Sequence, residues 1–120
     1  MPETRLPHNH GQAIEQHVDH MPRTEEFSIM ADIFKLLGDS SRLRIFWLLC
    51  HGEECVTNLS VMMDMTSPAV SHHLKLLRAN NLIVSRREGK EVYYRAADTE
   101  QAEMLHDAIE NLVKISCPGK

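Results

Sequence analysis

Residues 66–78 constrain the fold more than any other part of the chain, because they predict a short helix with a defined start. The Ser67 side chain can accept a hydrogen bond from a free backbone N–H, and Pro68 suits the first helical position. Apolar residues at helical spacing predict a buried face, made by Val70, Leu74 and Leu77. The outer face then carries small polar groups and a cation, namely Ser67, Ala69, Ser71, His72 and Lys75. Such a face fits the major groove of DNA, and the alternative is a surface helix of some other small domain.

Three further helices are predicted before this segment. The first runs over residues 24–37 and is capped by Thr24. The second starts at residues 39–41 and is apolar nearly all round, as expected of a buried central helix. The third runs over about residues 55–63. Because only residues 64–66 join it to the segment described above, the two short helices are typical of a helix-turn-helix.

After residue 81 the periodicity changes from that of a helix to that of strands. Residues 82–87 and 91–95 predict two strands, and Gly89 between them can supply the positive φ of a tight turn. A basic hairpin directly after a helix-turn-helix is a wing, whose tip can lie along the phosphates or in the minor groove. Three cations of the hairpin therefore join the candidate DNA contacts: Arg86, Arg87 and Lys90.

A last helix is predicted from a cap at Asp98 or Thr99 to about Ile115. Its apolar residues recur at steps of three and four, the pattern of a helix that packs against a partner helix: Ala102, Leu105, Ile109 and Leu112. Packing on the chain's own core is the alternative. We favour a homodimer, because small helical domains often gain core by dimerising.

The net charge, −4 at pH 7, is unfavourable at first sight for a nucleic-acid binder. Between residues 66 and 95, however, six Lys and Arg stand against two Glu, which is a local charge of +4. Attraction to phosphates depends on the local face and not on the total. The charge distribution is therefore compatible with a DNA partner.

The first 23 residues are interpreted as a flexible arm with a helical turn around residues 13–18, because they hold three prolines, four histidines and little apolar periodicity. The folded domain is then expected at 24–116, followed by a tail at 117–120. No apolar run approaches the ~18 residues of a membrane span, and the start lacks a signal peptide's apolar segment. Three cysteines, an odd number, argue against a secreted disulfide scaffold. We expect a cytoplasmic protein with no membrane partner.

Five stretches of the chain, taken together and in this order, resemble the ArsR/SmtB family of bacterial winged-helix repressors, which sense metals or thiol-reactive species: residues 36–45, 54–56, 67–74, 87–90 and 92–94. The resemblance covers about residues 25–115. It implies a homodimer that occupies an operator when unliganded and releases it when an inducer binds. It does not identify the inducer, because members use different sites on one scaffold.

The first candidate ligand site centres on Cys55. The resemblance implies that in zinc, cadmium and lead sensors a cysteine before the third helix joins ligands from the N-terminal arm. Here the arm offers four histidines, of which the last two are expected to share a helical face: His8, His10, His17 and His20. A thiolate with two or three imidazoles is a good tetrahedral zinc set and a poorer one for lead. Unspecific metal scavenging by the arm is the alternative.

The second candidate site lies on the last helix. The resemblance implies an aspartate and a histidine at the helix start, with a histidine and an acid or histidine about thirteen residues later. This chain offers Asp98 and Glu100 at the first pair. At the second pair it has Asn111 and Lys114, so we expect this arrangement to be lost. Three residues on one helical face form a displaced candidate, with a solvated surface as the alternative: Glu103, His106 and Glu110.

Thiol chemistry is the third candidate, because arsenite, persulfide and oxidant sensors need two or three thiols within bonding range. The chain offers Cys50, Cys55 and Cys117. Cys50 lies in a buried helix, where a cysteine is more often a small hydrophobe than a reactive thiolate. Cys117 follows the last helix and could reach the arm or a partner subunit. This candidate ranks behind the metal site at Cys55.

The sequence thus predicts a mainly α fold with a small β-hairpin, a homodimeric winged helix-turn-helix. Its predicted function is that of a repressor released from double-stranded operator DNA by a transition metal ion, with zinc or cadmium expected. The alternatives are a thiol-based sensor and a constitutive DNA-binding protein without an inducer. We do not expect an enzyme, because no pair of histidines at metal-ligand spacing sits beside a general base in the folded region.

Overall fold

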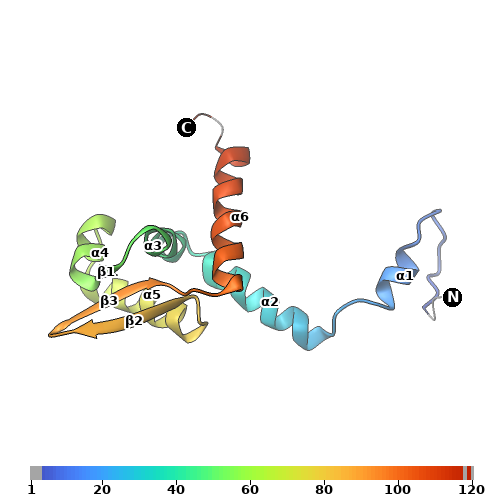
Figure 1. Cartoon of the computed structure of the whole chain (residues 1–120). Coiled ribbons are helices and arrows are strands. Elements are labelled where there is room, and N and C mark those ends of the chain that lie inside the picture. The colour runs from blue at the N-terminus through green and yellow to red at the C-terminus, as the bar shows by residue number, and fades with distance from the viewer. Residues whose placement is uncertain (1–3, 118, 120) are drawn as a thin grey trace. The chain divides into compact units, whose positions relative to one another are not determined.

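The structure, a computed structural model, describes residues 4–117 and 119, and its contacts divide the chain between residues 32 and 33. Each of the two units is described by itself below. Figure 1 labels the elements, which are α1 (Ile14–Val18), α2 (Thr24–Leu37), α3 (Ser40–His51), β1 (Glu54–Cys55), α4 (Val56–Met63), α5 (Ser67–Ala79), β2 (Ile83–Glu88), β3 (Glu91–Ala96) and α6 (Glu100–Ser116). The predicted mainly α fold with a β-hairpin is confirmed.

The unit that begins at residue 33 contains an antiparallel sheet with the strand order β1-β3-β2. Strands β2 and β3 form the predicted hairpin, with Glu88 opposite Glu91 and Gly89 at φ +63° in the turn. Strand β1 pairs Glu54 with Tyr94 on the outer side of β3. The sequence analysis had assigned Cys55 to the third helix and did not predict β1, so the helix begins one residue later, at Val56.

The core of this unit lies between the helices α3, α4 and α5 and the base of the hairpin. Its largest fully buried side chains come from all of these elements: Ile45, Phe46, Leu59, Val70, Leu74, Leu77, Leu82 and Ile83. Burial of each such side chain stabilises the fold by about 1.5–3 kcal/mol. The expectation that α3 is buried all round is wrong at Trp47, which is 37% exposed.

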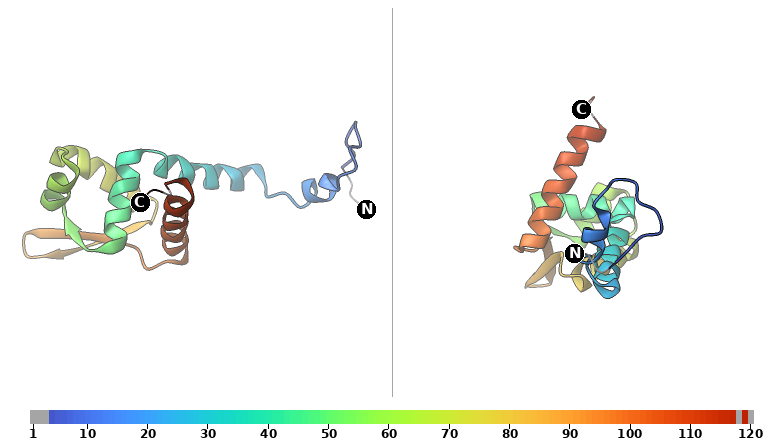
Figure 2. Two further views of the ribbon diagram at one scale, coloured as in Figure 1. Left: turned by 90° about the horizontal axis from the view of Figure 1, so that it is seen from above. Right: turned by 90° about the vertical axis from the view of Figure 1, so that its right-hand side faces the viewer.

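The helix starts show which polar side chains satisfy the first free backbone N–H groups. Helix α5 is capped by Thr66, whose Oγ1 accepts from the backbone N–H of Ala69, so the predicted cap at Ser67 is wrong by one residue. Asp39 caps α3, which begins where expected, and of the two predicted caps of α6 it is Thr99 that caps the helix. Helix α6 projects from the body of its unit in Figure 1 and in the right-hand view of Figure 2.

The first unit contains α1 and most of α2. Helix α1 ends at Val18, so His20 lies in the turn that follows and not on the expected helical face with His17. Thr24 is the first residue of α2 and does not precede it as a cap. Instead, Glu26 reaches back and accepts from the backbone N–H of Arg23. Of the helices in the described part of the chain, none has the length and apolar character needed to cross a membrane.

Candidate functional site

The first half of α5 presents the face that the sequence predicts to read DNA. Val70, His73, Leu74 and Leu77 turn inward and are buried. Of the five predicted contact residues, Ala69 is half-buried. The other four are exposed: Ser67, Ser71, His72 and Lys75. A hollow of about 410 Å³ between α5 and β3 is lined by Ser71, Lys75 and Arg78, among others. The helix thus offers hydroxyl, imidazole and ammonium groups to a partner on one side.

Helix α5 is braced on its inner side by α3. Arg42 of α3 donates from Nε to the carbonyl of Leu36 at 2.7 Å, and its Nη1 lies 3.3 Å from Nδ1 of the buried His73. A guanidinium can only donate, so Nδ1 is the acceptor in this pair. Burial lowers the pKa of His73, which favours the neutral ring that the hydrogen bond requires. His73 is therefore a structural residue of the helix-turn-helix.

The wing separates its three predicted contacts into two groups. Arg87 and Lys90 are exposed near the tip. Arg86 is engaged within the protein: it donates to Glu53 at 2.6 Å and to Glu88 at 2.7 Å, and its guanidinium lies 4.8 Å from the centroid of the Tyr93 ring. The Arg86 contact holds the pKa of the Glu53 carboxyl below its usual value. Arg86 thus anchors the wing to the segment before β1.

Cys55 lies where β1 passes into α4. The backbone of Cys55 pairs with that of Tyr93 in the sheet, and the Cys55 thiol is free and half-buried. The neighbouring Glu54 accepts from Asn58 Nδ2 at 2.8 Å. The arm histidines belong to the other unit, where the rings of His8 and His10 stack with centroids 5.9 Å apart. The ligand set of Cys55 with the arm therefore stays a prediction.

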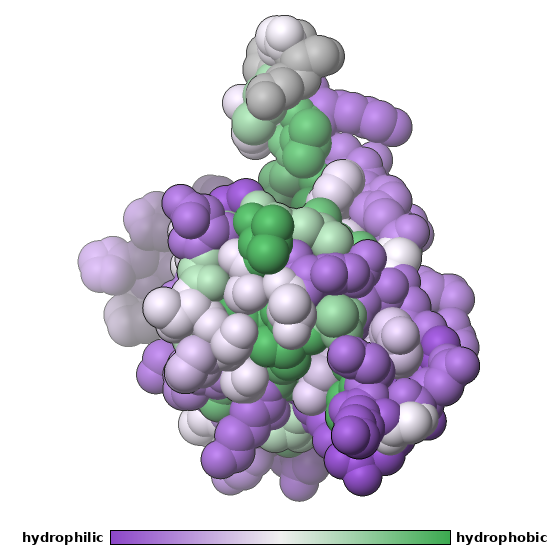
Figure 3. Space-filling model, turned by 90° about the vertical axis from the view of Figure 1, so that its left-hand side faces the viewer, coloured by the Kyte–Doolittle hydropathy of each residue, from purple (hydrophilic) through white to green (hydrophobic). Residues whose placement is uncertain are grey.

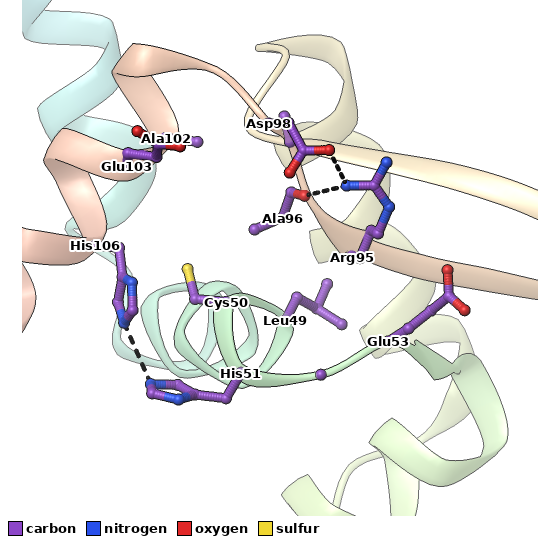
Figure 4. A pocket seen from close by; sticks show the side chains of 12 residues that line it. Leu49, Cys50, His51, Glu53, Arg95, Ala96, Asp98, Ala102, Glu103 and His106 are labelled. Atoms are coloured by element: carbon purple, nitrogen blue, oxygen red, sulfur yellow. Dashed lines mark hydrogen bonds and ion pairs between the residues drawn. The ribbon is translucent and has the colours of Figure 1, made fainter.

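The candidate residues of the last helix divide in the structure. Asp98 precedes α6 and forms an ion pair with Arg95 at 2.8 Å, and Glu100 is exposed in the first turn. Glu103 and His106 line an open pocket of about 330 Å³, shown in Figure 4. His106 and Glu110 come together at 3.1 Å.

A residue that the sequence analysis missed completes this second group. His51, at the end of α3, has its Nε2 3.2 Å from Nε2 of His106 and 3.2 Å from Oε1 of Glu110. Trp47, one turn earlier on α3, donates from Nε1 to the same oxygen at 2.9 Å. These hydrogen bonds, that of His51 first, lower the pKa of Glu110. The spacing of Trp47 and His51, four residues apart on one helix, places both on one face, but nothing in the sequence pairs them with α6.

The three cysteines are all free thiols. Cys50 is half-buried, and its thiol points into the pocket of Figure 4. Burial and the nearby Glu110 raise the pKa of Cys50 to about 11, so the thiol stays protonated at neutral pH. Cys117 is exposed at the end of α6. Of these thiols, Cys50 behaves as the small hydrophobe that the sequence suggests.

Comparisons with known proteins agree with this geometry. The sequence profile described as "Bacterial regulatory protein, arsR family" matches residues 39–85, from the cap of α3 into β2. A "Transcriptional repressor SmtB homolog" of Synechocystis is 33% identical over 112 residues, which cover 93% of this chain and 85% of the relative. An "Arsenical resistance operon repressor" of Escherichia coli is also 33% identical, with coverage of 78% and 92%.

Solved structures give the same fold. The homodimeric winged helix-turn-helix DNA-binding domain of a possible ArsR-family transcriptional regulator from Mycobacterium bovis superimposes with a TM-score of 0.66 at 29% identity. The match covers 75% of this chain and 82% of that one. The sequence matches, the order of elements and the wing beside α5 lead to one conclusion. The chain belongs to the ArsR/SmtB family of winged helix-turn-helix transcriptional regulators.

Proposed function

We propose that this protein is a homodimeric transcriptional repressor that occupies operator DNA and releases it when a transition metal ion binds, with zinc or cadmium as the inducer. The observation that carries the DNA-binding part is the exposed polar start of α5 beside a basic wing. The names of the two relatives above, a repressor and an arsenical resistance operon repressor, support the repressor role. Because the partner is DNA, we propose the cytoplasm as its place of action.

In this proposal the exposed residues of α5 read base edges, and the wing contacts the backbone. Ser71, His72 and Lys75 would enter the major groove, with Ser67 and Ala69 at the helix start close to the phosphates. Arg87 and Lys90 would contact phosphates from the wing. Arg86 would reach DNA only by giving up its carboxylate partners, so we assign it a positioning role in the wing.

The dimer is supported by apolar surface that a single chain leaves uncovered. An apolar groove of about 460 Å³ runs along α6, lined among others by Phe34, Leu43, Leu105 and Leu112. Phe34 is 76% exposed and Ile115 is 75% exposed. Figure 3 shows apolar side chains gathered along α6 below its C-terminal end. Exposed apolar surface of this kind marks an interface, and a second α6 would cover it.

The inducer site proposed from the sequence joins Cys55 with the arm histidines His8, His10, His17 and His20. The free, half-buried thiol of Cys55 at the start of α4 supports a ligand role, since α4 is the supporting helix of the helix-turn-helix. A thiol sensor is the second candidate, built on the same Cys55 with Cys50 and Cys117. The raised pKa of Cys50 disfavours it, because the thiolate is the reactive form.

Fluorescence anisotropy of labelled operator DNA tests this function. Metal-free protein should bind, and separate additions of zinc, cadmium, nickel, arsenite and persulfide should identify the inducer class. Release by zinc or cadmium that is lost in Cys55→Ser, with unchanged metal-free binding, supports the Cys55 site. Release by arsenite or persulfide alone supports the thiol sensor. Binding that none of these additions changes would show a constitutive DNA-binding protein and contradict the proposal.

A further inference from the structure

The structure brings three potential ligand atoms together between the C-terminal end of α3 and α6, in a cluster that does not include Cys55. They are Nε2 of His51, Nε2 of His106 and Oε1 of Glu110, separated from one another by 3.2, 3.1 and 3.2 Å. From these atoms we infer a metal site, which binds a zinc ion through two imidazoles and one carboxylate. The inference rests on the proposed metal control for its regulatory meaning and on the geometry alone for binding.

The size of this triangle fits a zinc ion. A tetrahedral ion with bonds of about 2.0–2.1 Å holds its ligand atoms about 3.3 Å apart. The three observed separations lie within about 0.2 Å of that edge, so the spacing of the ligand atoms already suits the ion. Placed above the triangle, it would leave one coordination position open. The side chains of His51, His106 and Glu110 are 46%, 27% and 40% exposed, so a water molecule can fill that position.

The short contact between the two imidazole nitrogens also favours a cation. Two Nε2 atoms 3.2 Å apart can share one proton at most, because two N–H groups aimed at each other would clash. At least one of the two ring nitrogens therefore presents a lone pair to the other and to a carboxylate oxygen. A cation at the centre accepts all three lone pairs together, which a single proton cannot do.

Trp47 supplies the outer contact that metal-binding carboxylates usually have. Its Nε1 donates to Glu110 Oε1 at 2.9 Å, and its ring lies 4.2 Å from that of His51. Such contacts orient the ligands and strengthen binding. Since a carboxylate oxygen has two lone pairs, it can accept from Trp47 and bind the ion at the same time.

The chemistry of the set selects among metals. Two imidazoles and a carboxylate suit zinc, cobalt and nickel, whereas thiolate sets suit softer ions. This site therefore prefers zinc to cadmium and does not bind arsenite, in contrast to a site built on thiols. The chain would then hold two sites of different preference, one at Cys55 and one between α3 and α6.

The position of the site links two parts that a repressor must couple. Helix α3 braces α5 through Arg42 and His73, and α6 carries the uncovered apolar face. An ion that ties His51 to His106 and Glu110 fixes the angle between these helices. Allosteric couplings typically change an affinity by about 5- to 150-fold. Fixing the angle between α3 and α6 would have to lower the affinity of the protein for its operator by a factor in this range.

Trp47 is the only tryptophan of the chain, so its fluorescence reports on the site directly. Zinc titrated into metal-free full-length protein, without DNA, should change this fluorescence with one ion per protomer. His51→Gln and His106→Gln should each weaken that binding by about 10-fold or more. In a Cys55→Ser background, which removes the thiolate of the other proposed site, cobalt should give the visible absorption of a tetrahedral ion, and adding His51→Gln or His106→Gln should abolish it. His72→Gln changes an exposed histidine outside the cluster. It is the matched control and should bind zinc as the wild type does.

The results separate this inference from the proposed function. If the wild-type fluorescence does not respond to zinc, or if both variants bind as tightly as His72→Gln, the site is wrong, whatever happens on DNA. If zinc binds here but does not release the operator, the site stands and the metal-controlled function fails. If release survives in His106→Gln and is lost in Cys55→Ser, regulation through this site is wrong. Circular dichroism of each variant confirms that it is folded.

Discussion

Arg42 Nη1 of α3 lies 3.3 Å from Nδ1 of His73, the one buried polar side chain among the described residues. This contact joins α3, which ends at His51 of the proposed metal site, with α5, the helix that we propose reads DNA. It requires an unprotonated Nδ1, so its strength depends on pH. Protonation of His73 is therefore expected to lower the stability of the fold and to weaken the contact that positions α5.

The first prediction concerns stability between pH 7 and pH 5. The pKa of His73 is lowered, chiefly by burial and further by Arg42 and His72, while Asp39 opposes the shift. Above about pH 6.5 the His73 ring is neutral in both the folded and the unfolded protein, so its titration does not change the free energy of unfolding. Below it the unfolded chain takes up a proton that the folded protein resists, so the free energy of unfolding must fall as the pH falls.

Urea denaturation of metal-free protein at several pH values measures this loss, which amounts to about 1.4 kcal/mol per unit by which the pKa is lowered. His73→Asn should flatten the pH dependence in this window. Asp39, whose pKa is lowered from 3.8 by the backbone N–H of Arg42, acts only at lower pH and does not interfere. A wild-type stability that rises from pH 7 to pH 5 would contradict the role of His73.

The second prediction separates the cations of the wing. Lys90→Ala and Arg87→Ala should each reduce the slope of log affinity against log salt by about 1, on any DNA sequence. Arg86→Ala should change the slope less, because its charge is already paired with Glu53 and Glu88. Anisotropy titrations over a range of salt concentrations measure the slopes. An equal loss for Arg86 and Lys90 would show that Arg86 leaves its carboxylates to bind DNA.

The third prediction concerns base reading by α5. Removing a side chain that contacts a base edge costs about 1–3 kcal/mol of operator affinity and relaxes specificity at that position. We expect this result for His72→Ala on operator DNA and a much smaller loss on a scrambled duplex. Metal-free His106→Gln, far along the chain on α6, serves as the control and should bind both DNAs as the wild type does. Equal losses on both duplexes would make His72 a phosphate contact.

The fourth prediction tests the dimer face. Leu112 lies in the apolar groove and is 58% exposed in the single chain. Leu112→Asp should shift the protein to a monomer in sedimentation equilibrium. It should also weaken operator binding by about 100-fold or more, because each monomer binds one half-site without the linked contact of a second subunit. Asp107→Asn, an exposed position on the same helix, should leave both properties unchanged. A dimeric Leu112→Asp variant would place the interface elsewhere.

Local sequence signals predicted the fold well. Pro68 and the spacing of Val70, Leu74 and Leu77 placed α5, and Gly89 placed the hairpin turn. The cap was assigned one residue too late because Thr66 and Ser67 can both cap a helix and Pro suits either of its first two positions. Strand β1 was missed because two residues show no alternation, and its pairing with β3 is a long-range contact.

The candidate site was predictable only in part, for the same reason. His106 and Glu110, four residues apart on one helix, were found from their spacing. His51 lies 55 residues before His106, and only the packing of α3 against α6 brings them together. Likewise the engagement of Arg86 with Glu53, 33 residues earlier, decides that its charge is not free, although composition counted it among the basic residues.

Release of the operator by metal is the central claim, and one titration tests it most directly. Metal-free wild-type protein should bind labelled operator DNA with a dissociation constant of about 10⁻⁸ M or below at physiological salt. One to two zinc ions per protomer should then return the anisotropy to that of free DNA, and a chelator should restore the complex. An anisotropy that stays at the bound value through this zinc titration would contradict the account.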